Sequence, residues 1–154
     1  MRIRRNMPKH EETRLLPYRP EQMFALVADV ARYPEFLPWC AAARVRSRRP
    51  LAQDGEEMLA DLVIGFQVFR ERFGSRVRLL PEAGHIETEY LDGPFKYMRS
   101  HWWFEPAEEG CRVRFDVDFE FKNFLLQKAG GVFFYEAMQR IVKAFEARAK
   151  ALYG

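Results

Sequence analysis

The stretch that decides the fold is Cys111-Arg112-Val113-Arg114-Phe115-Asp116-Val117-Asp118-Phe119-Glu120-Phe121-Lys122. Apolar and polar side chains alternate along it without a break. Because successive side chains of a strand point to opposite faces of a sheet, this pattern predicts a strand with one apolar face and one charged face. Such strands are typical of antiparallel sheets whose apolar face is covered by another element.

The segment that follows is predicted to be that cover. Its apolar residues recur at the three- and four-residue spacing of a helix: Phe134, Met138, Ile141, Val142, Phe145, Ala149 and Leu152. Polar residues such as Glu136 and Lys143 occupy the opposite side. We expect a long helix from an Asn123 cap to Tyr153, lying across the apolar face of the sheet.

The rest of the chain is predicted to add six strands and a helical region. The strands are expected at residues 13–18, 41–49, 58–68, 69–79, 85–92 and 95–105, with a turn at Gly93-Pro94 between the last two. A helix fits residues 20–31, and residues 33–40 carry large apolar rings between prolines. This order indicates an α+β fold, with a seven-stranded antiparallel sheet and a long C-terminal helix.

Length and composition indicate one domain. The 154 residues suffice for a single substantial core, which we expect residues 8–154 to form after a lead of residues 1–7. The 25 basic residues are nearly balanced by 22 acidic ones, which argues against DNA as a partner. Cys40 and Cys111 lie far apart, which favours free thiols and a cytoplasmic location. No apolar run reaches the roughly 18 residues that a membrane span needs.

Arginines dominate the predicted outer face of two strands. They are Arg44, Arg46, Arg48, Arg49, Arg70, Arg72, Arg76 and Arg78. They could form a basic surface for RNA or anionic lipid. Acidic residues such as Glu87, Glu89 and Asp116 are predicted to point to the same side, so we favour cross-strand charge pairing.

The sequence predicts neither a catalytic set nor a metal site. His10, His85 and His101 lie on separate predicted elements, and their spacing places no two of them on one metal ion. We therefore expect each histidine at the surface or at a strand edge. The serines lack the context of a nucleophile elbow, and no glycine-rich phosphate loop is present.

The number of aromatic rings raises the question of a cavity. The chain has 14 Phe, 6 Tyr and 3 Trp residues, more than a thin layer of helix on sheet needs. These rings either fill the core or leave room between sheet and helix for an apolar guest. The candidate polar groups facing such a guest are Glu71, Ser75, Thr88 and Tyr90, although a buried ion pair would also explain Glu71.

Three stretches carry a resemblance to a known family. They are residues 24–40, Gly93-Pro94-Phe95-Lys96 with Trp102 and residues 104–106, and residues 115–123. On these stretches the chain resembles the coenzyme Q-binding protein and ribosome association toxin family of the START-like, helix-grip superfamily, which is also called polyketide cyclase-like.

The resemblance implies a seven-stranded antiparallel sheet around the C-terminal helix, with an apolar tunnel between them. One branch of the family is understood to bind ubiquinone without catalysing a reaction, in support of respiration and quinone synthesis. It needs no cofactor, and its partners would include respiratory or quinone-biosynthesis proteins. The other branch includes proteins described as blocking the association of ribosomal subunits.

We therefore expect a non-enzymatic carrier of ubiquinone or a similar isoprenoid lipid. The predicted ligand-binding residues are Leu62, Ile64, Phe66, Phe73, Val77, Tyr90, Met98, Trp102, Phe115, Val117, Phe134, Met138 and Ile141. Exposed rings and side chains at Phe36, Leu37 and Trp39 would form the entrance and touch the membrane transiently, and Tyr90 and Tyr135 are candidate donors to the quinone head. Two alternatives stay open: a protein that binds the large ribosomal subunit, and a cyclase- or aromatase-like enzyme that uses Glu71, His101 and Tyr135.

Overall fold

The computed structural model describes residues 9–66, 69–122 and 124–154, and for residues 66, 69 and 124–135 it describes the backbone alone. The predicted lead of residues 1–7 lies outside this description. In chain order the elements are β1 (Lys9–Leu16), α1 (Pro20–Ala28), the 3-10 helix η1 (Val30–Glu35), β2 (Cys40–Pro50), β3 (Glu56–Phe66), β4 (Phe69–Leu80), β5 (His85–Asp92), β6 (Phe95–Ala107), β7 (Gly110–Phe121) and α2 (Phe124–Tyr153).

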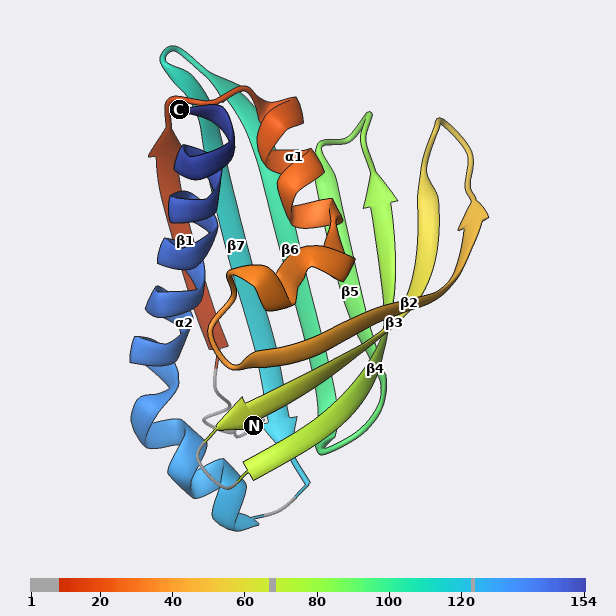
Figure 1. Ribbon diagram of the computed structural model, residues 1–154, viewed down its shortest axis with the longest axis vertical. Coiled ribbons are helices and arrows are strands. Elements are labelled where there is room, and N and C mark those ends of the chain that lie inside the picture. Colours follow the sequence, from red (N-terminus) through yellow and green to blue (C-terminus); the bar gives the residue numbers. More distant parts are fainter. Residues whose placement is uncertain (1–8, 67–68, 123) are drawn as a thin grey trace, which may run out of the picture.

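The strands form one antiparallel sheet, as predicted. Its seven strands lie in the order β1-β7-β6-β5-β4-β3-β2, so that the first strand is brought beside the last. Figure 1 shows α1, η1 and α2 on the same side of the curved sheet, with α2 running along β1 and β7. The predicted architecture, a seven-stranded antiparallel sheet with a long C-terminal helix, is confirmed.

The core lies between the inner face of the sheet and the helices. On β7 the buried residues are the alternate apolar ones, including Cys111, Val113 and Phe115. They pack in one cluster with Val27 of α1 and Phe145 of α2. Burial of this apolar surface stabilises the fold by about 25 cal/mol per Å².

The turn between β5 and β6 requires its glycine. Gly93 has a φ of +139°, and a Cβ there would lie 2.7 Å from the Cβ of Phe73. Few side chains adopt this backbone conformation, and none would fit so close to β4. The predicted turn at Gly93-Pro94 is therefore confirmed.

Two predicted boundaries are wrong. The first strand spans Lys9–Leu16 instead of residues 13–18, because His10 and Glu12 take inward positions on β1 and hide the apolar alternation. The first α-helix ends at Ala28, and Val30–Glu35 forms a 3-10 helix. Asp29 leaves helical geometry, with a φ of −85° and a ψ of +66°, and so separates the two helices.

In the part of the chain that the structure describes, no helix combines the length and the apolar character that crossing a membrane requires.

Candidate functional site

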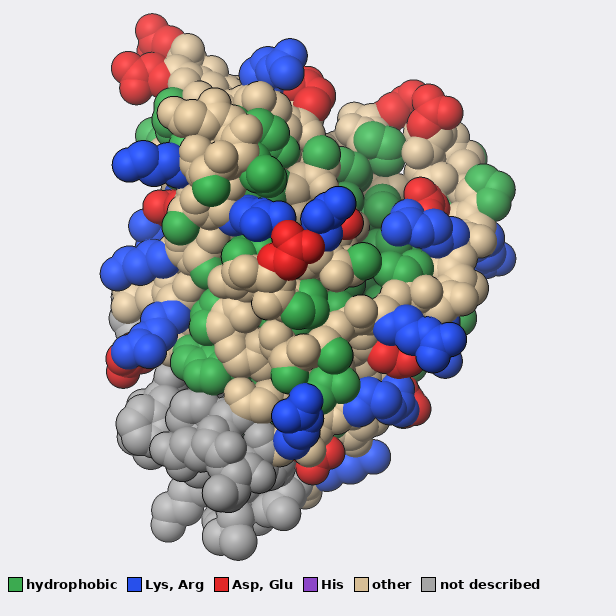
Figure 2. All heavy atoms as spheres, viewed as in Figure 1, with side chains coloured by type: hydrophobic (Ala, Val, Ile, Leu, Met, Phe, Trp, Pro, Cys, Tyr) green, Lys and Arg blue, Asp and Glu red, His purple; other side chains and the backbone are tan. Residues whose placement is uncertain are grey.

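Burial varies along the inner face of the sheet. On β3, Met58 and Ala60 are fully buried, whereas Leu62 and Ile64, further along the same face, are half-buried. Met98 of β6 also packs on the core while keeping contact with solvent. Figure 2 shows hydrophobic side chains in a hollow between α1 and the β2–β3 hairpin, toward the end of the sheet where β3 begins. The inner face thus offers apolar surface that a guest can reach.

The predicted ligand-binding residues divide into two groups. Those that belong to the closed core are Phe73, Val77, Trp102, Phe115 and Val117. Those that are half-buried and pack against this core are Leu62, Ile64, Tyr90, Met98, Met138 and Ile141. The side chains of Phe66, Phe134 and Tyr135 lie outside the described residues. The half-buried group is the better candidate for ligand contact, because its surface is not yet covered.

Many of the aromatic rings fill the core, as the simpler interpretation of the ring count proposed. The Trp102 ring lies 4.4 Å from that of Phe115 and 5.0 Å from that of Phe145, centroid to centroid. Phe145 also meets the ring of Tyr33 at 5.4 Å. These contacts join β6, β7, η1 and α2 into one rigid cluster beside the accessible surface.

Residues with hydroxyl groups occupy neighbouring inward positions on three strands, where Ser75 and Ser100 are buried and Thr88 and Tyr90 are half-buried. Ser75 of β4 pairs directly with Tyr90 of β5, and Thr88 of β5 pairs with Ser100 of β6. The Tyr90 oxygen accepts a hydrogen bond of 3.2 Å from the N–H of Phe95. Burial raises the pKa of Tyr90, so its hydroxyl stays protonated and can donate. We call Ser75, Thr88, Tyr90 and Ser100 the hydroxyl row.

The sequence interpretation named three members of this row and missed Ser100. The alternation that placed Met98 and Trp102 on the inner face could have identified Ser100 as well, because Ser100 lies midway between them on the same face of β6. Glu71 also faces inward, opposite Ile64 of β3, and is half-buried.

The predicted entrance is less open than expected. Phe36, Leu37 and Trp39 are half-buried, so the prediction that they are exposed is wrong. The ring of Phe36 lies 5.2 Å from that of Phe145, and the guanidinium carbon of Arg148 lies 5.1 Å from its centroid. These side chains are half-buried because η1 packs against α2 and thereby holds the following segment, residues 36–39, against the helix.

Trp39 adopts a backbone conformation that is unusual for a bulky residue. Its φ is +64°, in the left-handed region. The carbonyl of Trp39 accepts a hydrogen bond of 2.8 Å from the N–H of Gly65, which ties the segment to the end of β3. The strained residue therefore lies next to Ile64, at the accessible part of the inner face.

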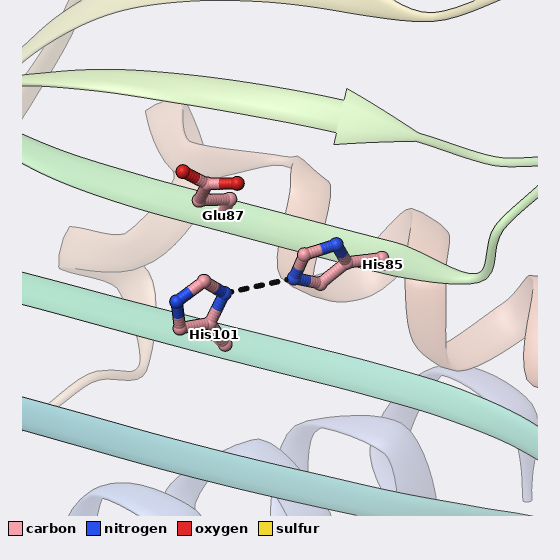
Figure 3. A group of neighbouring side chains, drawn as sticks. All are labelled: His85, Glu87 and His101. Atoms are coloured by element: carbon pink, nitrogen blue, oxygen red, sulfur yellow. Dashed lines mark hydrogen bonds between the residues drawn. The ribbon is translucent and has the colours of Figure 1, made fainter.

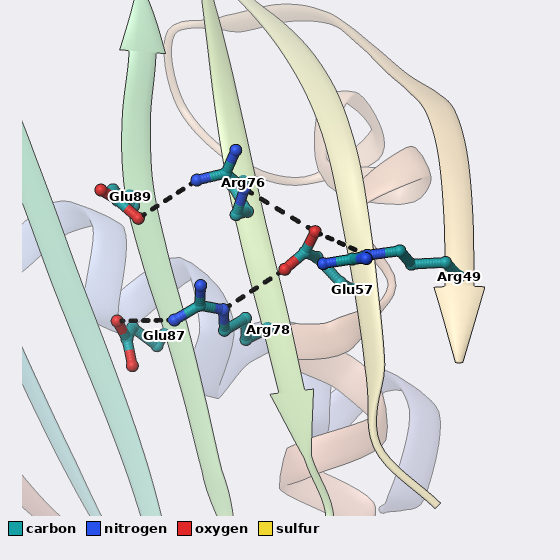
Figure 4. A network of polar contacts seen from close by, with 6 residues as sticks. All are labelled: Arg49, Glu57, Arg76, Arg78, Glu87 and Glu89. Atoms are coloured by element: carbon teal, nitrogen blue, oxygen red, sulfur yellow. Dashed lines mark hydrogen bonds and ion pairs between the residues drawn. The ribbon is translucent and has the colours of Figure 1, made fainter. Parts of the chain in front are cut away.

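The outer face is a network of paired charges, as predicted. Glu57 is only 8% exposed, and its carboxylate lies 3.0 Å from Arg49, 3.7 Å from Arg76 and 3.3 Å from Arg78 (Figure 4). Hydrogen bonding to Arg49 is the main cause that lowers the pKa of Glu57. The network continues to Glu87 and Glu89 on β5, which pair with Arg78 and Arg76.

The prediction that the histidines lie apart is wrong. Nε2 of His85 and Nδ1 of His101 share a hydrogen bond of 2.9 Å, and Glu87 lies beside them on the outer face (Figure 3). The missed signal was the symmetry of the β5–β6 hairpin, which pairs Glu87 with His101 across the predicted turn. Burial is the main cause that lowers the pKa of His85, and the charge of His101 adds to it.

His10 is buried, although its strand, β1, is an edge strand of the sheet. Its side chain is 5% exposed and lies 2.9 Å from the carboxylate of Glu12. Glu12 in turn pairs with Arg14, which reaches Glu146 of α2 at 3.1 Å. This chain of charges fastens α2 to β1 at the edge of the sheet.

The enzyme alternative loses part of its proposed catalytic set. Glu71 faces inward opposite Ile64, whereas His101 faces outward beside Glu87. The sheet therefore separates two of the three residues that the sequence offered for a cyclase-like reaction.

Comparison with known proteins shows the family. A family model described as "Polyketide cyclase / dehydrase and lipid transport" matches residues 16–146. The chain belongs to this family. The START-like, helix-grip resemblance of the sequence is thereby confirmed.

Relatives within the polyketide cyclase, dehydrase and lipid transport family carry two kinds of name. A Rickettsia prowazekii protein named "Ribosome association toxin RatA" is 37% identical over 147 residues, which cover 94% of this chain and 97% of that protein. A Xenopus laevis protein named "Coenzyme Q-binding protein COQ10 homolog B, mitochondrial" is 34% identical over 151 residues, which cover 95% of this chain and 59% of that protein. Neither name describes a reaction.

A solved structure agrees with this assignment. The solution structure of an 18 kDa protein from Caulobacter crescentus is 37% identical and superposes with a TM-score of 0.80, covering 96% of this chain and 99% of the other. The family fold thus extends over nearly the whole chain.

Proposed function

We propose that this chain binds ubiquinone, or a similar isoprenoid quinone, on the accessible inner face and delivers it without catalysing a reaction. The observation that carries the proposal is the half-buried apolar surface of Leu62, Ile64 and Met98 beside the hydroxyl row. The similarity to a protein named for coenzyme Q binding supports the choice of ligand. Delivery would serve respiratory or quinone-biosynthesis proteins after transient contact with a membrane surface.

The two parts of the ligand would meet two kinds of surface. The isoprenoid tail would cover the half-buried apolar side chains, gaining about 25 cal/mol per Å² of apolar area removed from water. The carbonyl oxygens of the quinone head are acceptors, and the half-buried hydroxyls of Thr88 and Tyr90 are donors of matching polarity. Tail recognition is then loose, whereas the head is oriented by hydrogen bonds.

A ribosome-directed role is the second candidate. The relative named as a ribosome association toxin is slightly more similar in sequence, at 37% against 34% identity. Arg44 and Arg70 are exposed on the outer face, where they could approach a polyanion. Such binding would weaken steeply with added salt.

Extraction of the purified protein tests the quinone proposal directly. Organic extraction followed by mass spectrometry is expected to release a quinone at close to one molecule per chain. Leu62→Trp should reduce this yield by about tenfold, because a ring added at a half-buried inward position fills the space of the ligand. Leu15→Trp is the matched control, since its side chain is 68% exposed on β1 and away from the inner face.

Two neighbouring tryptophans give a second measurement. Trp102 is buried on the inner face, whereas Trp103 lies on the outer face and stacks on His85. Because Trp39 also lies beside the proposed ligand surface, the titration uses Trp39→Phe as the parent protein. A short-tailed ubiquinone should quench fluorescence equally when Trp103→Phe is added to this parent, and much less when Trp102→Phe is added. Equal quenching in all three proteins, or extracts without quinone, would contradict the proposal.

A further inference from the structure

We propose that His85, Glu87 and His101 form a binding site for one divalent transition-metal ion such as Zn²⁺ on the outer face of the sheet. The ligand atoms that these residues offer all lie within 4.8 Å of one another. The site is separate from the inner face, so it goes beyond the proposed quinone binding and does not depend on it.

The hairpin of β5 and β6 builds the site. His85 and Glu87 are two residues apart on β5, so their side chains point to the same face. His101 of β6 is the direct cross-strand partner of Glu87 and the diagonal neighbour of His85. All three residues thus project from regular paired backbone, which holds ligands more firmly than a loop does.

Neighbouring side chains hold the imidazoles in place. The Trp103 ring stacks on His85 at 4.8 Å with an interplanar angle of 4°, and on His101 at 5.0 Å with 17°. The guanidinium of Arg114 lies over Trp103 at 4.2 Å. Asp116 of β7 is the cross-strand partner of His101 on its other side, where a carboxylate can orient the ring.

The three ligand atoms suit a metal ion that is intermediate between hard and soft. Two imidazole nitrogens and one carboxylate are ligands that Zn²⁺, Ni²⁺ and Cu²⁺ accept, and half-buried side chains leave a position for water. Nε2 of His85 and Nδ1 of His101 are now 2.9 Å apart and share one proton. When both lone pairs turn to the metal, that proton moves to the other nitrogen of its ring, so both imidazoles remain neutral.

Calorimetric titration of the full chain with zinc chloride, after removal of bound metal with a chelator, tests the site. We expect one ion per chain, with the affinity reduced at least about tenfold in His101→Ala and in Glu87→Gln. Glu89→Gln is the matched control: it lies on the same face of β5 and pairs with Arg76, outside the three ligands, and should bind zinc as before.

Two further variants keep the test decisive. Cys40→Ser should bind zinc unchanged, and loss of binding there would place the ion on the thiol and overturn the proposal. Equal zinc affinity in His101→Ala and the unaltered protein would also overturn it. Far-UV circular dichroism shows whether each variant is folded.

Trp103 supplies a local optical signal for the same site. Cu²⁺ bound between His85 and His101 should quench its fluorescence, because the indole stacks on both rings. In Trp103→Phe the quenching should disappear while calorimetry still detects binding. Quenching that survives in Trp103→Phe would place the copper elsewhere and contradict the assignment.

Discussion

At the scale of single residues, Glu57 is the charge on which the outer face depends. Its nearly buried carboxylate neutralises arginines from β2 and β4. We expect Glu57→Gln to lower the thermal midpoint at pH 7 by a few degrees, because Arg49, Arg76 and Arg78 are then left facing one another. Thermal unfolding followed by circular dichroism measures this change.

The effect of Glu57 should vanish in acid. The folded-state pKa of Glu57 lies below its ordinary value of 4.5, so the carboxylate contributes stability above that value. This contribution is lost as pH falls from 4.5 through the lowered pKa, and the midpoints of Glu57→Gln and the unaltered protein should then converge. Glu89→Gln, with a side chain 43% exposed and one arginine at 3.5 Å, should differ little at either pH. A midpoint difference that persists in acid would contradict this account.

The sequence predicted the charge pairs but not the histidine cluster, because the two predictions need different structural information. Arg76 and Glu89 are also direct cross-strand partners, but long charged side chains on one face of neighbouring strands can pair in more than one register, so alternation alone indicates charge pairing. The contact of His85 with His101 requires the register between two strands as well. Gly93-Pro94 indicated that register, since Glu87 and His101 lie at equal distances along the chain from Pro94.

At the scale of elements, α2 is held to the sheet by the ring of Phe145. This side chain is 3% exposed and meets rings from η1 and β6. Phe145→Ala should lower the free energy of unfolding by about 3–5 kcal/mol, because it removes buried apolar surface and leaves a cavity in a rigid cluster. Urea denaturation measures the loss.

Leu152 of the same helix is the control for this prediction, because it is exposed although the sequence placed it in the apolar stripe facing the sheet. Its side chain is 52% exposed, so Leu152→Ala should change the free energy of unfolding by no more than about 0.5 kcal/mol. If both variants lost stability equally, helix propensity along α2 and not the packing of Phe145 would hold the element.

Most strands were predicted close to their observed bounds, whereas β1, whose inward positions include His10, Glu12 and Arg14, was not. His85–Asp92 was predicted with the bounds that the structure shows, and the C-terminal helix with the same last residue. β1 was misplaced because His10 and Glu12 face inward through a charge network that no periodicity reveals. The half-burial of Leu62 and Phe36 was equally hidden, since it depends on where η1 and α2 lie over the sheet.

At the scale of the whole molecule, the two candidate functions use opposite faces of one sheet. A quinone would contact the inner face at Leu62, whereas a ribosome would meet the exposed outer arginines Arg44 and Arg70. The thickness of the sheet separates these surfaces, so variants at one should leave the other unchanged.

This separation gives a double test of function. In Leu62→Trp we expect quinone binding to fall by about tenfold, because the added ring occupies the ligand's space. In the double variant Arg44→Glu, Arg70→Glu we expect it to stay unchanged. Any cosedimentation with large ribosomal subunits in sucrose gradients should be lost in the double arginine variant and kept in Leu62→Trp. It should also weaken with added salt. Loss of quinone binding in the arginine variant, with its fold intact by circular dichroism, would mean that the ligand contacts the outer face and that the inner face is not the site.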